Sequence, residues 1–168
     1  MEEVLREIST LAVRLNEGAF TDEQKNSQWL GAQPASAAEI ALAERRLNID
    51  LPEDYRKFLL ITNGFFTPCD STEPTFESVS KIDYLKNIDP FLIKLCQDEP
   101  LIEEGKKLAR SIVIAGINDE QYFLLTLPAT DGEKWDYWKF ANWAPDGFPY
   151  ADLRNYFNSV LDFMKKVG

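Results

Sequence analysis

The amino-acid sequence predicts an α+β fold in a single domain, with an antiparallel β-sheet flanked by helices. Apolar residues recur at helical spacing in the first third and at the C-terminal end, and aromatic or β-branched runs separated by turn residues occupy positions 111–140. N-terminal helices, then antiparallel strands, then a closing helix are typical of α+β domains. A chain of 168 residues, 45% of them apolar, can build a complete core, so we expect one domain over residues 1–168.

The first helix is predicted within residues 1–18, because apolar side chains between Val4 and Leu15 recur at helical spacing. Gly18 can supply the left-handed residue that ends such a helix. The polar stretch 21–28 and the Trp29-Leu30-Gly31 segment that follows it are interpreted as a connection without regular structure.

Two more helices are predicted before residue 66. Ser36 and Glu39 have the spacing of a capping box, so a helix should begin near residue 37 and end at Asn48. Pro52 is suited to the first position of the next helix, and Asn63-Gly64 should end that helix.

The middle of the chain is predicted from local signals. Residues 65–79 contain two prolines and little periodicity, which indicates a loop with at most a short strand. Residues 80–87 are compatible with a strand or with a turn leading into one. A short helix is expected from Asp89-Pro90, and another over residues 100–110.

The β-sheet is predicted in the second half of the chain. Three antiparallel strands joined by tight turns are expected over residues 112–117, 121–127 and 135–140. Residues 141–150 contain two prolines and a glycine and are interpreted as a loop. The closing amphipathic helix is expected to begin after Asp152, which would cap it.

Alternation along the third strand places Trp135 and Tyr137 on one face of the sheet and Trp138 and Phe140 on the other. At least one of these faces must pack against helices. We favour core positions for both. The alternative is that one face is uncovered and forms an aromatic binding surface of the kind enriched in hot spots.

Enzymatic chemistry finds little support in the composition. The chain has no histidine, which excludes Ser-His-Asp and Cys-His triads and HExxH zinc sites. The closest glycines are 11 positions apart, too far for a GxGxxG motif or a P-loop. A carboxylate-dependent hydrolase is the remaining alternative, but Asp131, Glu133 and Asp136 fit hairpin-turn chemistry better. We therefore expect no catalytic residues and no cofactor.

Metal binding and disulfide formation are not expected either. Cys69 and Cys96 lie 27 positions apart, form no CxxC pair and have no histidine partners for a zinc site. Free thiols in a reducing compartment are favoured over a disulfide between them. The acidic N-terminus is followed by no apolar segment of the signal-peptide kind, so a cytoplasmic location is expected.

The charge of the chain constrains its partners. Its 28 acidic and 18 basic residues give a net charge of −10, and residues 67–104 alone contain nine acids and three bases. Such a field repels nucleic acid and anionic membranes and accelerates encounters with basic proteins. Solubility alone is the competing explanation of this acidity.

A series of short motifs lies between residues 29 and 65. The motifs are Trp29-Leu30-Gly31, Pro34-Ala35-Ser36 with Glu39-Ile40, Glu44 with Leu47, Leu51-Pro52 with Asp54-Tyr55 and Phe58-Leu59, and Asn63-Gly64-Phe65. In order and spacing they resemble the SUKH superfamily, the Smi–Knr group of fungal cell-wall regulators and bacterial toxin-immunity proteins. The resemblance covers about residues 27–165; the first helix and the segment 67–104 are less tied to it.

The resemblance implies an α+β fold without enzyme activity and, for bacterial members, immunity by binding and blocking a toxin, often a nuclease. Combined with the acidity, it predicts a protein partner that is a basic toxin domain, bound through an acidic rim with an aromatic centre. An intracellular scaffold of the cell-wall-regulator type is the alternative, and the oligomeric state stays open. The candidate contact residues are Asp70, Glu73, Glu77, Asp98 and Glu99 for the rim, with Trp143 and Phe148 as anchors.

Overall fold

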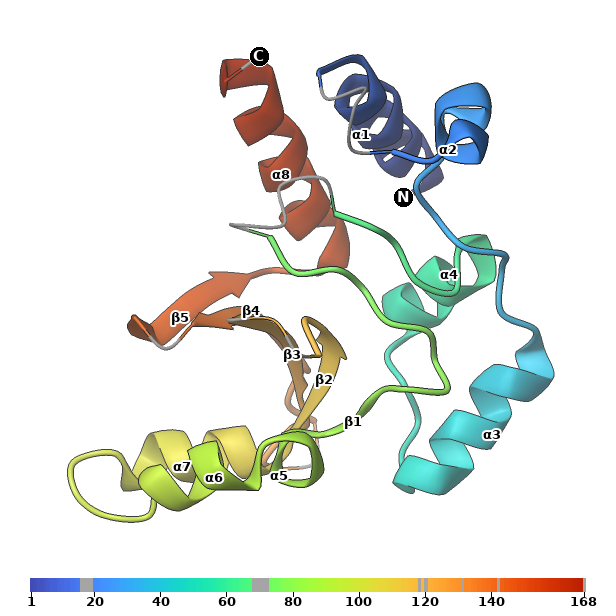
Figure 1. Cartoon of the computed structure of the whole chain (residues 1–168). Coiled ribbons are helices and arrows are strands. Elements are labelled where there is room, and N and C mark those ends of the chain that lie inside the picture. Colours follow the sequence, from blue (N-terminus) through green and yellow to red (C-terminus); the bar gives the residue numbers. More distant parts are fainter. Residues whose placement is uncertain are drawn as a thin grey trace.

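The protein is seen here in a computed structural model. It describes residues 1–15, 20–67, 73–117, 119, 121–130, 132–141 and 143–167, without the side chains of residues 145, 146 and 167. Figure 1 shows the sheet between two helical layers, with α8 (Leu153–Val167) on one side and α5, α6 and α7 on the other. The α+β prediction, with N-terminal helices and a closing helix, is confirmed.

Within the described ranges, four helices precede the sheet: α1 (Glu2–Leu15), α2 (Asp22–Ser27), α3 (Ala37–Leu47) and α4 (Glu53–Ile61). Three of them are the predicted ones, while the predicted stop at residue 18 lies outside the described residues. The interpretation of residues 21–28 as irregular was wrong, because they contain α2. This helix buries none of its residues, so it has no apolar periodicity; its sequence signal is the capping box between Thr21 and Gln24.

The predicted ends of α3 are confirmed. The Ser36 side chain accepts a hydrogen bond from the Glu39 backbone N–H, and the Glu39 carboxylate accepts one from the Ser36 backbone. Asn48 ends the helix in the left-handed conformation, with φ of 55°. Pro52 precedes α4 as its N-cap residue, one position earlier than predicted.

In the part of the chain that the structure describes, five antiparallel strands form one sheet in the order of the chain: β1 (Asp83–Tyr84), β2 (Ser111–Ala115), β3 (Gln121–Thr126), β4 (Asp136–Ala141) and β5 (Ala144–Tyr150). The predicted three-stranded meander is its centre. Residues 80–87, which were expected to form a strand or a turn leading into one, contain β1. This strand forms one edge of the sheet, and a helix follows it directly.

The interpretation of residues 141–150 as a loop was wrong, because they form β5 at the other edge of the sheet. An edge strand pairs on one side only, so proline, which lacks an N–H, is tolerated there; Pro149 lies opposite Trp138. Gly147 has φ of +65°, and a Cβ on it would meet the Trp138 ring at 2.4 Å. Pro149 and Gly147 are therefore compatible with an edge strand that packs closely against the Trp138 ring. The prediction failed because these residue types are also typical of turns.

Three short helices cover the second face of the sheet: α5 (Leu85–Ile88), α6 (Pro90–Leu95) and α7 (Ile102–Ala109). The predicted helices at 89–90 and 100–110 are confirmed as α6 and α7. Asp89 caps α6, since its side chain accepts a hydrogen bond from the Leu92 backbone N–H at 2.9 Å. Asp152 likewise accepts from the Asn155 backbone at 2.7 Å, at the start of α8.

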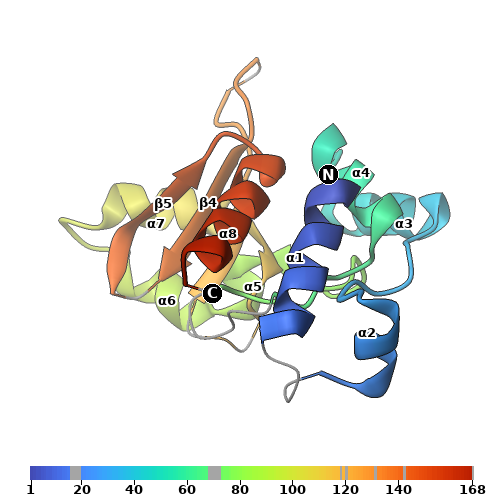
Figure 2. The same cartoon turned by 90° about the horizontal axis from the view of Figure 1, so that it is seen from above.

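The hydrophobic core lies on both sides of the sheet. One cluster joins α1, α3, α4 and α8 to the sheet and includes Tyr137; the other lies between the sheet and α5–α7 and includes Trp138 and Phe140. The predicted alternation and the core interpretation are confirmed for Tyr137, Trp138 and Phe140, whereas Trp135 lies just before β4 and is only partly buried. α1 and α8 lie side by side (Figure 2), and an ion pair of 2.6 Å between Lys165 and Glu7 joins them.

Phe76 connects the helical part of the first cluster to the sheet. Its backbone forms an antiparallel bridge with Phe65, just after α4, and another with Ala115 of β2. Its side chain is 2% exposed. Its ring contacts aromatic rings of three elements at centroid distances of 5.3, 5.5 and 5.0 Å: Phe58 of α4, Phe123 of β3 and Phe157 of α8.

The substitution Phe76→Ala should lower the free energy of unfolding by about 3–5 kcal/mol, because it opens a cavity where these rings meet. Phe163→Ala, on the outer face of α8 where the ring is 44% exposed, should cost less than about 1 kcal/mol. Urea denaturation of both variants measures the difference. Equal losses would contradict the central place of Phe76.

Candidate functional site

The predicted acidic rim divides into paired and free carboxylates. Asp70 lies outside the described residues. Glu73 and Glu77 have side chains that are only 13% and 14% exposed, and each forms an ion pair with a lysine. Asp98 and Glu99 are exposed in the α6–α7 loop. The two predicted anchors are exposed as well, Trp143 by 60% and Phe148 by 45%.

Glu73 belongs to a nearly buried polar network on the α8 side of the sheet. Its carboxylate accepts hydrogen bonds from Lys139 Nζ at 2.9 Å and from the Tyr156 hydroxyl at 2.8 Å. Phe148, opposite Lys139 in the register of β4 and β5, places its ring centroid 5.4 Å from Lys139 Nζ. Glu73 thus has a structural role that charge counting could not reveal, and Phe148 partly covers this network.

The structure does not bring the predicted residues together on one surface. Glu73 and Phe148 lie on the face of the sheet toward α8, whereas Asp98 and Glu99 lie in the loop of the opposite layer (Figure 1). Trp143 stands at the turn between β4 and β5. Any partner that contacts all of them must therefore reach around the β5 edge.

The candidate carboxylate cluster after β3 is engaged in turn structure. Glu133 accepts hydrogen bonds from the Ala129 and Thr130 backbones and from the Thr130 hydroxyl, and the hydroxyl bond chiefly lowers the pKa of Glu133. Asp136 forms an ion pair of 3.6 Å with Lys107, and residue 131 lies outside the described residues. Within the described ranges, no three His, Cys, Asp or Glu side chains are grouped to hold a metal ion.

Three of the motif residues hold the N-terminal helices in place. Glu44 accepts hydrogen bonds from the Leu51 backbone at 2.8 Å and from Arg56 Nε at 2.6 Å, so it fixes the connection between α3 and α4. Tyr55 and Phe58 are completely buried. These motif positions therefore stabilise the fold.

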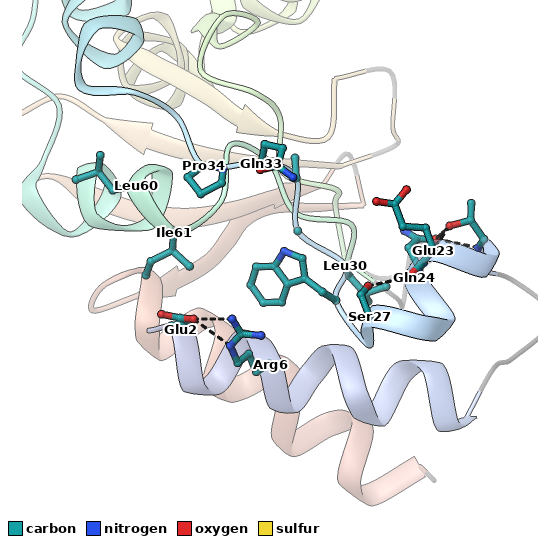
Figure 3. A pocket seen from close by; sticks show the side chains of 14 residues that line it. Glu2, Arg6, Glu23, Gln24, Ser27, Leu30, Gln33, Pro34, Leu60 and Ile61 are labelled. Carbon is teal, nitrogen blue, oxygen red and sulfur yellow. Dashed lines mark hydrogen bonds and ion pairs between the residues drawn. The ribbon is translucent and has the colours of Figure 1, made fainter.

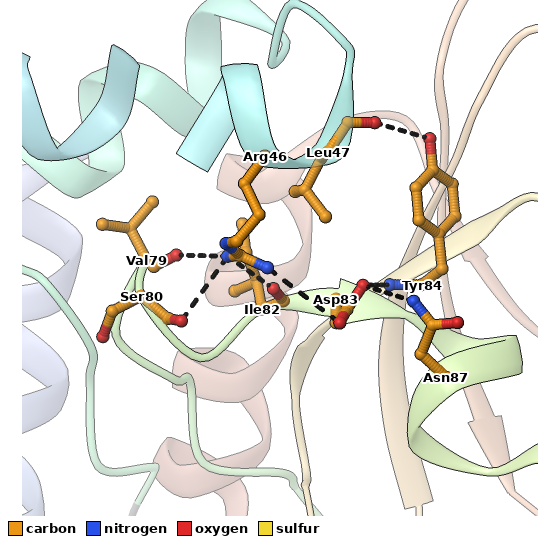
Figure 4. A network of polar contacts seen from close by, with 8 residues as sticks. All are labelled: Arg46, Leu47, Val79, Ser80, Ile82, Asp83, Tyr84 and Asn87. Carbon is orange, nitrogen blue, oxygen red and sulfur yellow. Dashed lines mark hydrogen bonds and ion pairs between the residues drawn. The ribbon is translucent and has the colours of Figure 1, made fainter. Parts of the chain in front are cut away.

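Arg46 of α3 binds the chain just before β1 (Figure 4). Its guanidinium donates to the carbonyls of Val79 at 3.3 Å and Ile82 at 2.9 Å, and its other terminal nitrogen lies 4.0 Å from an Asp83 carboxylate oxygen. The Tyr84 hydroxyl donates to the last carbonyl of α3. This clamp fixes the edge of the sheet to the N-terminal helices.

A hollow of about 810 Å³ lies between α1, α2 and the end of α4 (Figure 3). Its walls include Trp29 and Leu60. The Arg6 guanidinium lies 5.1 Å from the centroid of the Trp29 ring and is bonded to Glu2 at 2.8 Å. This hollow has mixed polarity, and sequence reasoning missed it because α2, one of its walls, was not predicted.

The family model described as the SMI1 / KNR4 family (SUKH-1) matches residues 34–166. The chain belongs to this family. The match includes every element from α3 to the sheet and nearly all of α8, so the resemblance inferred from the motifs is confirmed. A search among curated proteins finds no significant match. In this SMI1/KNR4-family chain, α1, α2 and Trp29 precede the matched range, which places most of the hollow outside it.

None of the helices that the structure describes is both long enough and apolar enough to traverse a bilayer. Cys96, the cysteine among the described residues, is a free thiol and is 8% exposed. Burial raises the pKa of this thiol, which keeps it protonated and weakly reactive at neutral pH.

The substitution Arg46→Met should lower the free energy of unfolding by about 1–3 kcal/mol, because carbonyls that now accept charged hydrogen bonds lose their donor. Arg45→Met, at the exposed neighbouring position of α3, removes the same charge and should change stability by less than about 0.5 kcal/mol. Chemical denaturation compares the two. A similar loss in both would show that charge, and not the clamp, matters.

Buried tyrosines should make the protein sensitive to alkali. Burial raises the pKa of Tyr122 to about 12, reinforced by the Asp89 carboxylate, and it raises the pKa values of Tyr55, Tyr137 and Tyr156. In each case the folded state favours the neutral hydroxyl.

The stabilisation from these tyrosines is complete below pH ~10, where the unfolded chain also keeps its tyrosines protonated, and it is lost as the pH rises above that value. Urea denaturation should therefore show a falling free energy of unfolding above pH ~10. Tyr55→Phe should reduce this loss at little cost near neutrality, since the Tyr55 hydroxyl has no hydrogen-bond partner among the described residues. An unchanged stability up to pH ~11 would contradict the prediction.

Proposed function

We propose that this protein is a non-enzymatic binding domain that acts as a cytoplasmic immunity protein, neutralising a basic toxin domain such as a nuclease. Membership of the SMI1/KNR4 family supports a role in protein interaction. The observation that carries the proposal is the excess of acid: a net charge of −10, with nine acids against three bases in residues 67–104. An acidic surface fits a cleft that evolved to bind phosphate backbones.

The exposed members of the predicted rim are the proposed contacts. Asp98 and Glu99 have no basic partner in the described part of the chain, so their charge is available to a partner. Trp143 offers a large aromatic side chain at the β4–β5 turn, of the type that dominates interface energies. Glu73 and Glu77 stay weaker candidates, since binding would have to break their lysine pairs; Asp70 and Phe148 complete the proposed set.

Charge steers the encounter and aromatic burial slows dissociation in this proposal. Attraction between an acidic rim and a basic cleft raises association rates by roughly 10- to 1,000-fold at low salt. A scaffold or regulator of the cell-wall type remains the alternative function, and it requires no basic partner.

The test is affinity capture with the immobilised full chain from native lysate at low salt, elution by a salt gradient, and mass spectrometry. A single basic, nuclease-like protein at stoichiometric yield is the expected result. Acidic or heterogeneous partners, or none, would reject the immunity role and favour the scaffold.

Variants then locate the surface on the captured partner. Asp98→Lys with Glu99→Lys should lower the association rate by roughly ten-fold or more at low salt. The matched control, Asp22→Lys with Glu23→Lys on the exposed first turn of α2, changes net charge equally and should leave the rate nearly unchanged. Equal effects would show that only total charge matters and would remove the assignment to the α6–α7 loop.

A further inference from the structure

An apolar groove lies between α6 and α7, above β4. Phe91 and Leu95 of α6 are exposed by 68% and 58%, and Leu101, just before α7, by 38%. These side chains border a hollow of about 350 Å³. Large apolar side chains gathered at one hollow differ from scattered surface residues, which need no explanation.

The floor of this groove is part of the core. Leu108 of α7 and Phe140 of β4 line the hollow and are only 1% and 6% exposed, and both belong to the cluster between the sheet and α5–α7. The two walls are held close together, because a Cβ on Gly105 of α7 would meet the Cys96 carbonyl oxygen at 2.1 Å. The groove is therefore formed before any partner arrives.

The rim of the groove is acidic. Residues 89–104 contain five acids and one base. Glu104 lines the hollow, and Asp98 and Glu99 are exposed in the loop that joins α6 to α7. In the part of the chain that the structure describes, none of these three carboxylates has an ion-pair partner, whereas Glu103 is bonded to Lys106 at 2.6 Å. The groove thus combines apolar walls with uncompensated negative charge.

We propose that this groove binds a basic amphipathic helix of a protein partner. A bulky apolar residue of that helix enters the hollow, its apolar stripe covers Phe91 and Leu95, and lysine or arginine side chains beside the stripe meet Asp98, Glu99 and Glu104. The proposal rests on the proposed function, of which it names the docking element. It adds an apolar site that the predicted rim did not include.

The architecture favours a helix over an extended peptide. The groove is built on α6 and α7, whose backbone groups are used within the helices, so it offers no open strand edge for strand addition. Helices pack on helices by side chains alone, and residues spaced i, i+4 and i+7 meet such a groove. A second copy of this chain is disfavoured, because it would bring an identical acidic rim to the contact.

The direct test uses three synthetic peptides of about 18 residues, long enough to form a helix in the groove. The first carries leucines at i, i+4, i+7 and i+11 among lysines; the second has glutamates in place of the lysines; the third has the composition of the first with its leucines redistributed so that no stripe exists. Each is titrated into the isotope-labelled full-length protein and followed by NMR. Only the first should bind, in the micromolar range, with shifts confined to α6, α7 and neighbouring β4 residues.

Variants of the protein connect the binding to the groove. Phe91→Ser with Leu95→Ser should weaken binding of the first peptide at least ten-fold, and since both side chains are exposed the fold should persist, which the NMR spectrum of the free variant verifies. The matched control, Leu42→Ser on α3, removes a leucine that is 60% exposed and should leave affinity unchanged. Glu99→Lys with Glu104→Lys should weaken binding at low salt and abolish most of its salt dependence.

Three results would contradict the proposal that the groove binds a basic amphipathic helix: no binding of the first peptide at millimolar concentration, equal binding of all three peptides, or full affinity in the Phe91/Leu95 variant. The toxin proposal fails separately. If the Phe91/Leu95 variant captures a basic partner as well as the unmodified protein does, the immunity proposal is supported and the groove is rejected as the docking site. If the first peptide binds specifically but the lysate yields no basic partner, the groove is supported and the immunity proposal is rejected.

Discussion

The fold depends on the meeting of aromatic rings around Phe76. Its segment leaves the N-terminal helices, forms bridges to Phe65 and to Ala115 of β2, and places one ring against residues of α4, β3 and α8. The burial of apolar surface is the main stabilising contribution in such a core. Here the ring of Phe76 buries apolar surface against three elements at once. Phe76 thus adds a direct contact between the helical half and the sheet to those made by the Arg46 clamp and by α8.

The two sides of the sheet are completed differently. On one side α8 closes a continuous core together with α1 and the N-terminal helices. On the other side three short helices are too small to cover all their own apolar residues, and Phe91, Leu95 and Leu101 stay exposed. Residues 89–104, with five acids and one base, belong to this second side. A binding surface there follows from incomplete burial and uncompensated charge together, since either property alone is common on protein surfaces.

Carboxylates of equal appearance in the sequence have opposite roles in the structure. Glu44 organises the α3–α4 connection, and Glu73 joins Lys139 to Tyr156 in a nearly buried network. Asp98 and Glu99 are exposed and available. Which acids are free is decided by the lysines, arginines and tyrosines that approach from distant positions, and no local pattern reports their positions.

The sequence by itself determined the class of the fold, the family, the ends of α3, the central strands and the two faces of β4, because capping chemistry and apolar periodicity are local signals. Only the tertiary structure decided the rest. Residues 144–150 become a strand because β4 offers an open edge, α2 has no apolar face that a pattern could show, and the groove exists because α6 and α7 meet over Phe140. The predicted rim was divided between two layers for the same reason: sequence proximity and charge do not specify on which face of a sheet a residue will lie.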